Sequence, residues 1–259
     1  MNTDVLFKGK KINIVFSLWP QGTVAVPQWL SSHGIYRQLA DNYAKAGILQ
    51  RFAHGAFVRP HDTIHWFGAL YTLQEQLHYA VHVAGKTALQ LPHFSCLKSQ
   101  RSEPIVLFGV QGEKLPTWFK RSAWEVTFQY YKSNLFQHNR RLGLVPYETE
   151  HFPIRISTPE RAIMEFLYLI PQKANFQEAA QLMGMLKDLR PVLVQSLLED
   201  CMSVKVKRLF LFLAEAHQHA WVKELNRDRI NLGSGKRMIT KGGNFCSKYQ
   251  LSVPALEKA

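Results

Sequence analysis

The chain has 259 residues, 46% of them hydrophobic, so it can bury one or two substantial cores and is not an intrinsically disordered protein. Its 32 Lys and Arg against 19 Asp and Glu give a net charge of +13, which favours nucleic acid or another polyanionic surface as partner. Cys96, Cys201 and Cys246 lie too far apart for a disulfide framework or a metal site, and they suit a reducing cytoplasm.

The apolar run at residues 12–19 follows Lys10 and Lys11 and superficially resembles a signal peptide. The run is short and contains Asn13 and Ser17, so we predict the first core helix of a domain here. No apolar stretch approaches the roughly 20 residues that a transmembrane helix needs. We therefore expect a soluble, cytoplasmic protein without a membrane partner.

Residues 22–34 predict a short helix and a turn. Pro27 suits the first turn of a helix, where its missing N–H is tolerated, and Gly34 ends the helix. The apolar residues expected on one side of this helix are Val24, Val26, Trp29 and Leu30.

A second helix and a β-hairpin are predicted next. Residues 35–46 carry apolar side chains at spacings of three and four, and Gly47 ends the helix. Residues 48–52 and 56–59 are short β-like runs on either side of Gly55, which can supply the positive φ of a tight hairpin. The order of helix, turn, helix and hairpin is that of a winged helix-turn-helix.

A winged helix-turn-helix suggests binding to duplex DNA, because its second helix fits the major groove and presents its N-terminal residues to base edges. Arg37 and Gln38 have the donor geometry for G and A edges, whereas Lys45 is expected at a phosphate. The candidate DNA-contacting residues are Tyr36, Arg37, Gln38, Asn42, Lys45, Arg51, His54 and Arg59. A winged helix used only for protein contacts stays an alternative, because a fold does not fix a function.

Residues 62–156 predict a helix followed by a small mixed β-sheet. Residues 62–83 have helical spacing with Asp62 as the expected cap, and the first domain is expected to close near residue 92. A short helix is expected near residues 87–89, and the strand candidates are residues 104–108, 124–130, 143–146 and 152–156.

The remainder predicts a helical bundle. Thr158 can cap a helix that has Pro159 at its first position, whereas residues 157–160 also fit a capping box, and only one residue can be the cap. Further helices are expected at residues 176–187, 191–201, 204–219 and 221–225. The prediction is an α+β protein with a winged-helix domain at 1–92 and an α+β domain at 93–259 that comprises the sheet, the bundle and a basic tail.

Enzyme-like patterns are weak in this chain. Residues 85–87 lack the second glycine of a phosphate loop, the paired histidines near residues 78–82 and 217–219 lack a third ligand, and the cluster at residues 61–65 lacks a nucleophile. We predict no catalytic residue, no metal site and no cofactor. A nucleic-acid-modifying enzyme that docks through the winged helix stays the alternative, although residues 93–156 offer only scattered glutamates for its chemistry.

The chain resembles the AbiEi antitoxins of abortive-infection toxin-antitoxin systems. The resemblance runs in order from residue 11 to residue 254. The segments that carry it are residues 55–59, 66–70, 82–89, 157–162, 203–210 and 232–237.

The resemblance implies a bacterial, phage-defence antitoxin whose N-terminal winged helix represses its own promoter by binding inverted repeats. It also implies a C-terminal domain that neutralises an AbiEii-type nucleotidyltransferase toxin, and type IV systems imply no stable toxin complex, so direct contact stays open. The tail at 226–259 carries seven Lys and Arg and two acidic residues. The basic candidates for antitoxin or phosphate contact are Lys205, Lys207, Arg208, Lys236 and Arg237. The first three could instead form the solvated face of a helix.

Overall fold

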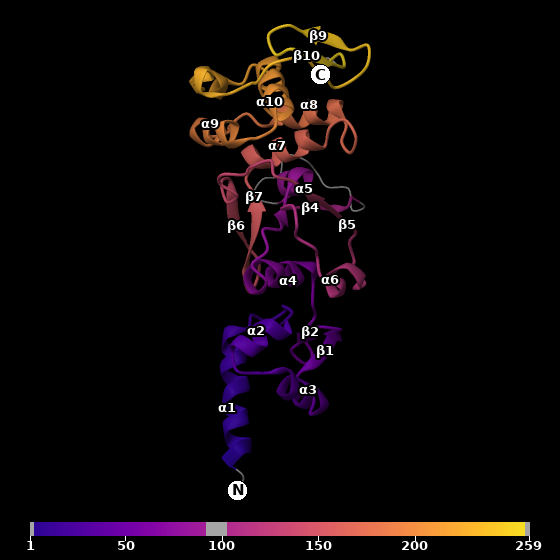
Figure 1. Ribbon diagram of the computed structural model, residues 1–259, viewed down its shortest axis with the longest axis vertical. Helices are drawn as coiled ribbons and strands as arrows, with labels where there is room; N and C mark the ends of the chain where they lie inside the picture. Colours follow the sequence, from indigo (N-terminus) through magenta and orange to yellow (C-terminus); the bar gives the residue numbers. More distant parts are fainter. Residues whose placement is uncertain (1–2, 92–102, 257–259) are drawn as a thin grey trace. The chain divides into compact units, whose positions relative to one another are not determined.

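The computed structural model describes residues 3–91 and 103–256 (Figure 1), which form a mixed α+β fold. The chain divides into two compact units. The first comprises Met1–His82, Gly112–Thr127 and Pro146–Arg155, and the second comprises Val83–Gln111, Phe128–Val145 and Ile156–Ala259. The two units alternate along the sequence, so they do not coincide with the division at residue 92, which stays a prediction about function.

The first unit begins with three helices and a hairpin. These elements are α1 (Thr3–Leu18), α2 (Pro27–Ser32), α3 (Arg37–Lys45), β1 (Gln50–Ala53) and β2 (Ala56–Val58). The strands pair antiparallel around Gly55, whose φ is +76°. The predicted hairpin and the predicted helices before and after Gly34 are therefore confirmed as local structure.

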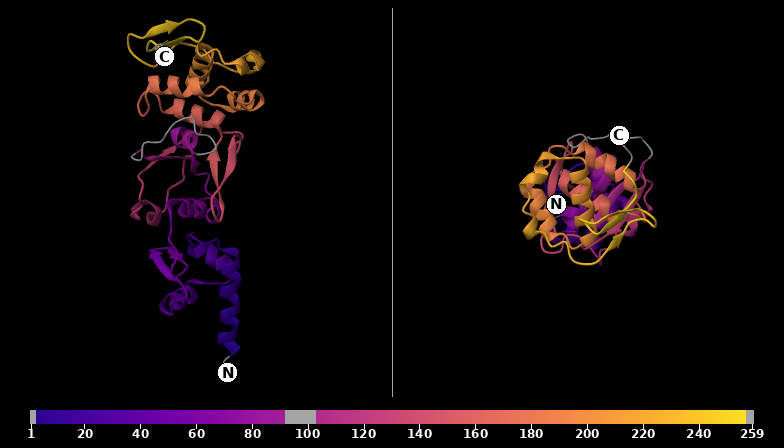
Figure 2. Two further views of the ribbon diagram at one scale, coloured as in Figure 1. Left: turned by 180° about the vertical axis from the view of Figure 1, so that it is seen from behind. Right: turned by 90° about the horizontal axis from the view of Figure 1, so that it is seen from above.

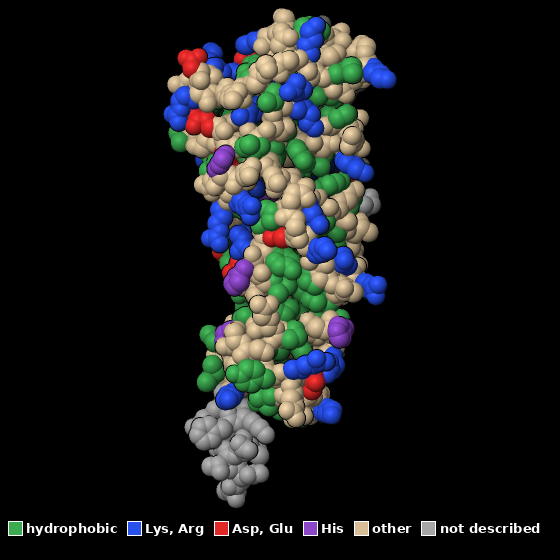
Figure 3. All heavy atoms as spheres, in the orientation of Figure 1, with side chains coloured by type: hydrophobic (Ala, Val, Ile, Leu, Met, Phe, Trp, Pro, Cys, Tyr) green, Lys and Arg blue, Asp and Glu red, His purple; other side chains and the backbone are tan. Residues whose placement is uncertain are grey.

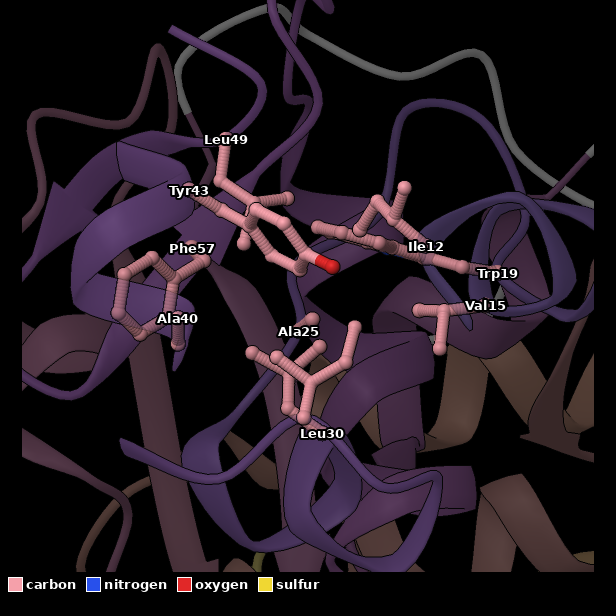
Figure 4. Close-up of a cluster of buried hydrophobic side chains, with 10 residues drawn as sticks. Ile12, Val15, Trp19, Ala25, Leu30, Ala40, Tyr43, Leu49 and Phe57 are labelled. Atoms are coloured by element: carbon pink, nitrogen blue, oxygen red, sulfur yellow. The ribbon is translucent and has the colours of Figure 1, made fainter. Parts of the chain in front are cut away.

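One apolar cluster holds these elements together (Figure 4). Ile12 and Val15 of α1 and Trp19 just after it meet Leu30 of α2 in this cluster, and every one of them is at most 5% exposed. The other buried members come from α3, the hairpin and the segments next to them, namely Ala25, Ile35, Ala40, Tyr43, Leu49 and Phe57. Burial of such side chains contributes about 1.5–3 kcal/mol each, so the cluster fixes α3 beside the hairpin.

The segment before α2 is extended, so the prediction that Val24 and Val26 lie in the helix is wrong. Thr72 and Gln76 donate side-chain hydrogen bonds to the carbonyl of Val24 at 2.6 and 2.9 Å. Ala25 exchanges two backbone hydrogen bonds with Phe57, at 2.8 and 2.9 Å. These long-range partners satisfy the backbone as a strand would, and the helix begins only at Pro27.

The predicted helix over 62–83 is shorter than expected. It is α4 (Trp66–Tyr71), which continues as a π-helical turn (Thr72–Gln76). Asp62 does not cap it, because His65 is the N-cap residue and the Asp62 carboxylate accepts a hydrogen bond from the N–H of Gly22 at 2.8 Å. Gly68 is required by close packing, since a Cβ there would lie 1.9 Å from the carbonyl oxygen of Gly22.

A five-stranded mixed sheet has the order β5-β4-β3-β7-β6, with β4 parallel to β5 and β3 parallel to β7. Its strands are β3 (His82–Val83), β4 (Ile105–Gly109), β5 (Phe128–Lys132), β6 (Leu144–Glu148) and β7 (Pro153–Ser157). The strand predicted over 124–130 begins later than expected. Trp124 instead donates its indole N–H to the carbonyl of Phe119 at 2.7 Å, next to the short helix α6 (Thr117–Arg121).

The second unit contains five α-helices in its described residues, and four of them lie in successive layers (Figures 1 and 2). The five helices are α5 (Gly85–Gln90), α7 (Pro159–Leu169), α8 (Phe176–Met185), α9 (Pro191–Asp200) and α10 (Val204–Ala216), followed by 3₁₀ turns at Ala220–Glu224 and Arg227–Arg229. Thr158 occupies the N-cap position and Pro159 begins α7, as one of the two predicted alternatives has it.

Helix α7 is buried on nearly all sides, and two of its carboxylates, Glu160 and Glu165, are buried in ion pairs. Arg161 donates to Glu165 at 2.7 Å and to the carbonyls of Arg140 and Leu142. Burial raises the pKa of Glu160, but hydrogen bonds from Arg190 outweigh that effect and lower the pKa. Both buried carboxylates are therefore held by guanidinium groups, that of Arg161 buried and that of Arg190 largely exposed.

The chain ends in a small sheet of order β8-β10-β9. Its strands are β8 (Arg237–Met238), β9 (Asn244–Cys246) and β10 (Leu251–Val253). None of the described helices is both long enough and apolar enough to cross a membrane.

His219 makes the second unit sensitive to acid. Its ring stacks on Trp221 with centroids 5.3 Å apart, and its Nε2 donates to the carbonyl of Met183 at 2.7 Å. Burial lowers the pKa of His219, and the nearby His217 and Lys187 lower it further. The unfolded chain therefore binds a proton more readily than the folded one, so stability is complete above pH 6.5 and falls as the pH drops below it.

We expect the loss of unfolding free energy between pH 7.5 and 5.0, measured by urea denaturation, to be smaller in His219→Gln than in the wild type. His138→Gln, which changes an exposed histidine of the same unit, should keep the wild-type pH dependence. Equal pH dependence in all three proteins would show that His219 does not couple folding to protonation.

Candidate nucleic-acid interface

The outward side of α3 carries a row of polar side chains. Ala40 and Tyr43 face the core, and the helical period then directs the residues between them to solvent. Tyr36 at the N-cap position is 66% exposed, and Arg37 and Gln38 in the first turn are exposed as well. Within the described chain, no ion pair or side-chain hydrogen bond engages Arg37 or Gln38. Both groups are free to meet a ligand.

Further along the same helix, Asn42 and Lys45 are also exposed. They lie one and two turns beyond Arg37, in the part of the helix where a groove-bound helix approaches the phosphate backbone. His54 at the tip of the hairpin is exposed too. The structure therefore leaves all three accessible, as the sequence prediction requires.

A cavity of about 220 Å³ separates α3 from the hairpin. Its lining includes Arg37, Arg51 and His54, with Phe57 and Pro27 as apolar parts. Helix and hairpin thus present cationic groups on one shared, concave surface.

Arg51 is held in place on this surface. Its guanidinium donates to the carboxylate of Asp41 at 2.5 Å and lies over the ring of Phe57, 5.4 Å from the centroid. The arginine side chain remains 55% exposed. An exposed pair of this kind contributes at most about 1 kcal/mol, so its main effect is to orient the hairpin against α3 and to neutralise Asp41.

Arg59 differs from the other candidates, because it is half-buried and engaged. Its guanidinium donates to the carbonyls of Phe16 and Trp19 at the end of α1, and it lies over both of their rings. Burial lowers the pKa of Arg59, although Asp62 opposes that effect. The carbonyls at a helix C-terminus attract a cation. The side chain therefore supports α1, and the prediction that it contacts DNA does not fit its position.

Arg59→Met should lower the unfolding free energy by about 1–2 kcal/mol, because two carbonyl hydrogen bonds are lost. Its affinity for duplex DNA, measured by fluorescence anisotropy at a temperature where the variant is folded, should equal that of the wild type. Lys45→Met, at an exposed position of α3, should show the reverse pattern of unchanged stability and weaker binding. Weaker binding by folded Arg59→Met would restore Arg59 as a DNA contact.

Three of the basic candidates in the second unit are not exposed, so the prediction that they form an exposed basic surface is wrong. Lys207 and Arg208 are 6% and 3% exposed, and Lys205 is half-buried. Arg208 donates to the carbonyls of Leu232, Gly233 and Gly235 at 2.6–3.0 Å. Lys207 donates to the carbonyl of Asn231, and Lys205 to those of Tyr168 and Ile170. These cations bind the peptide backbone and do not form a solvated helix face either. Lys236 and Arg237 are exposed.

Residues of the enzyme-like sequence patterns make ion pairs and hydrogen bonds within the protein. Lys86 pairs with Glu103 and Glu178 at 2.5 and 2.6 Å. Burial lowers the pKa of Lys86, but the two carboxylates outweigh that effect and raise the pKa. His61, Asp62 and His65 line an open cavity of about 560 Å³ in the first unit, where Asp62 holds the backbone of Gly22. Among the described residues, no group of three or more His, Cys, Asp or Glu is arranged to hold a metal ion.

Two family models together match nearly the whole chain. The model for the N-terminal domain of the transcriptional regulator AbiEi antitoxin matches residues 8–95. The model described as transcriptional regulator, AbiEi antitoxin, type IV toxin-antitoxin system matches residues 102–254. The chain belongs to the AbiEi antitoxin family. The resemblance found in the sequence is thereby confirmed, and the AbiEi chain is a transcriptional regulator of type IV toxin-antitoxin systems.

The fold of this AbiEi chain is similar to that of the RV2827C protein from Mycobacterium tuberculosis, known from a crystal structure. The TM-score is 0.50 at 14% sequence identity, over 88% of this chain and 85% of that one. At this identity the likeness concerns the fold alone. A comparison with curated proteins gave no match.

Sequence reasoning missed two features of this AbiEi chain. The sequence pattern assigns no role to Asp41, which pairs with Arg51 at the cavity between α3 and the hairpin. Met238 and Phe245, which are 64% and 49% exposed, were not considered at all. Strands of two and three residues give almost no periodic signal, so only the register of the folded sheet brings those two residues together.

Proposed function

We propose that residues 22–59 form a winged helix-turn-helix that binds operator DNA, with α3 in the major groove and the β1–β2 hairpin as the wing. The observation that carries this proposal is the exposed and unengaged N-terminal turn of α3, with Arg37 and Gln38 beside a cationic hairpin. Arg and Gln at that end of a recognition helix suit the edges of G and A. Membership of a family of transcriptional regulators supports the same reading.

The proposed operator consists of inverted repeats in the chain's own promoter, so the protein is an autorepressor. We assign DNA binding to residues 1–92, which agrees with the extent of the N-terminal family model at 8–95. We assign neutralisation of a cognate AbiEii-type nucleotidyltransferase toxin to residues 93–259, most of which match the antitoxin model.

Footprinting on the upstream region of the gene tests the DNA proposal directly. The full chain should protect repeated half-sites, and affinity should fall steeply with salt because phosphate contacts release counterions. Absence of protection, or equal affinity for the upstream region and random duplex, would refute it.

Point variants in the full chain separate the two roles better than truncation, because residues 112–127 and 146–155 belong to the first compact unit. The double variant Arg37→Ala with Gln38→Ala should lose repression of a promoter reporter. In cells that express the neighbouring nucleotidyltransferase, the same variant, supplied from an independent promoter, should still restore growth. Failure to restore growth at wild-type protein levels would contradict the division of roles.

A further inference from the structure

The outer face of the C-terminal sheet displays an apolar row. Central strand β10 is parallel to β8 and antiparallel to β9, and Ser252 is in register with Met238 on one side and with Phe245 on the other. Residues in register across neighbouring strands direct their side chains to the same face. Met238, Ser252 and Phe245 therefore form one row across all three strands.

This row faces solvent and not the core. The neighbours of Ser252 in β10, Leu251 and Val253, are 0% and 2% exposed, so the central strand is buried on the opposite face of the sheet. Met238 is 64% exposed and Phe245 is 49% exposed. Exposing large apolar side chains together on one face of a sheet costs free energy in water, and such exposed apolar groups often mark a binding site.

The segment that carries the row has basic residues and no acidic ones. Residues 230–256 contain no Asp or Glu, and they contain Lys236, Arg237, Lys241 and Lys248. The ammonium group of Lys236 lies 5.2 Å from the centroid of the Phe245 ring. Lys248 is occupied by Glu215, whereas no carboxylate of the described chain pairs with Lys236, Arg237 or Lys241. Figure 3 shows Lys and Arg side chains around the end of the second unit that carries these strands.

We propose that this face, defined by Met238, Ser252, Phe245 and Lys236, binds unpaired nucleic acid, with Lys241 in the turn that follows β8 as a further cation. Phe245 is a partly exposed aromatic ring with the Lys236 ammonium over one of its faces, and an aromatic ring near cations is the arrangement on which a base stacks while its phosphates are neutralised. A flat sheet carries no helix to enter a groove, and a paired base offers no open face for Phe245 to stack on. An acidic protein would satisfy the lysines but would leave the ring without a stacking partner.

This activity goes beyond the proposed operator binding, because it uses a different unit and a different form of nucleic acid. The α3 surface is expected to bind duplex, whereas the C-terminal face is expected to bind single strands. The two proposals can therefore fail separately. Arg37→Ala should lose operator affinity and keep single-strand affinity.

Fluorescence anisotropy with the full chain tests the proposal. The probes are a labelled 12-nucleotide RNA without secondary structure, the DNA of the same sequence, and a random duplex. We expect Phe245→Ala to bind the single strands about five- to a hundred-fold more weakly, and Phe245→Trp to bind them as well as the wild type. Lys236→Gln and Lys241→Gln should each reduce the salt dependence of single-strand binding. A preference between the RNA and DNA probes, with Phe245 required for both, supports the proposal and identifies the natural class.

Val192→Ala is the matched control, since Val192 on α9 is an apolar residue 81% exposed outside this face. It should bind all probes as the wild type does. Phe245→Ala that binds single strands normally, or that loses random duplex to the same extent, would overturn the proposal. Binding of polyglutamate but of no oligonucleotide would overturn it in favour of an acidic protein partner. Thermal unfolding of each variant confirms that the exposed substitutions leave the fold intact.

Discussion

Arg37→Ala is expected to weaken binding to the promoter operator by about 1–3 kcal/mol, a factor of roughly 5 to 150. The reason is that the Arg37 side chain is exposed at the first turn of α3, and nothing in the described chain holds it. If Arg37 donates two hydrogen bonds to a base edge, water that replaces the side chain in Arg37→Ala would not restore the full binding free energy. The measurement is anisotropy with labelled operator duplex at fixed salt, repeated with a random duplex.

The random duplex decides what Arg37 contacts. If Arg37 reads a base, its loss leaves affinity for the random duplex nearly unchanged. An equal loss on both duplexes would demote it to a phosphate contact. Arg141→Ala, at an exposed arginine of the second unit, controls for the loss of one positive charge and should alter neither affinity.

Arg161→Met should destabilise the second unit by about 3–5 kcal/mol, because it leaves the carboxylate of Glu165 buried without its cation. Glu165 is 0% exposed and Arg161 is 6% exposed. The substitution also removes the hydrogen bonds to the carbonyls of Arg140 and Leu142. Urea denaturation followed by circular dichroism should show a lower midpoint for the second unit.

Arg229→Met is the matched control, because its partner Glu199 lies at the surface and the arginine side chain is 65% exposed. Loss of such a pair costs less than about 1 kcal/mol. If Arg161→Met and Arg229→Met have similar midpoints, the α7 ion pair does not contribute to stability in the way that its burial implies.

The sequence was sufficient to predict local structure at positions where a single residue determines the backbone conformation. Gly55 supplies the positive φ of the hairpin, and Pro27 and Pro159 each stand at the first position of a helix. The predictions failed where hydrogen bonds from residues far away in the sequence determine the backbone conformation. Thr72 lies 48 residues from Val24, and its hydroxyl helps to keep the segment before α2 extended in spite of an apolar pattern that suits a helix.

The basic residues predicted to contact a partner show the same limit of sequence-based prediction. The exposed residues of α3 were predictable, because helical period alone separates them from Ala40 and Tyr43. Lys207 and Arg208 follow a pattern that equally suits a surface helix, yet the loop at residues 231–235 folds over them and offers its carbonyls. A long cationic side chain can interact with solvent, with a phosphate or with backbone carbonyls, and the spacing of residues in the sequence does not distinguish these cases.

The ion pair between Arg51 and Asp41 sets up a competition when a duplex arrives. A phosphate that approaches the exposed part of the Arg51 guanidinium would also approach the carboxylate of Asp41, which would repel it. The electrostatic attraction of the hairpin for any polyanion would thus be weaker than that of an unpaired arginine. In the proposed complex with operator DNA, selectivity would then rest on the base edges that Arg37 and Gln38 meet.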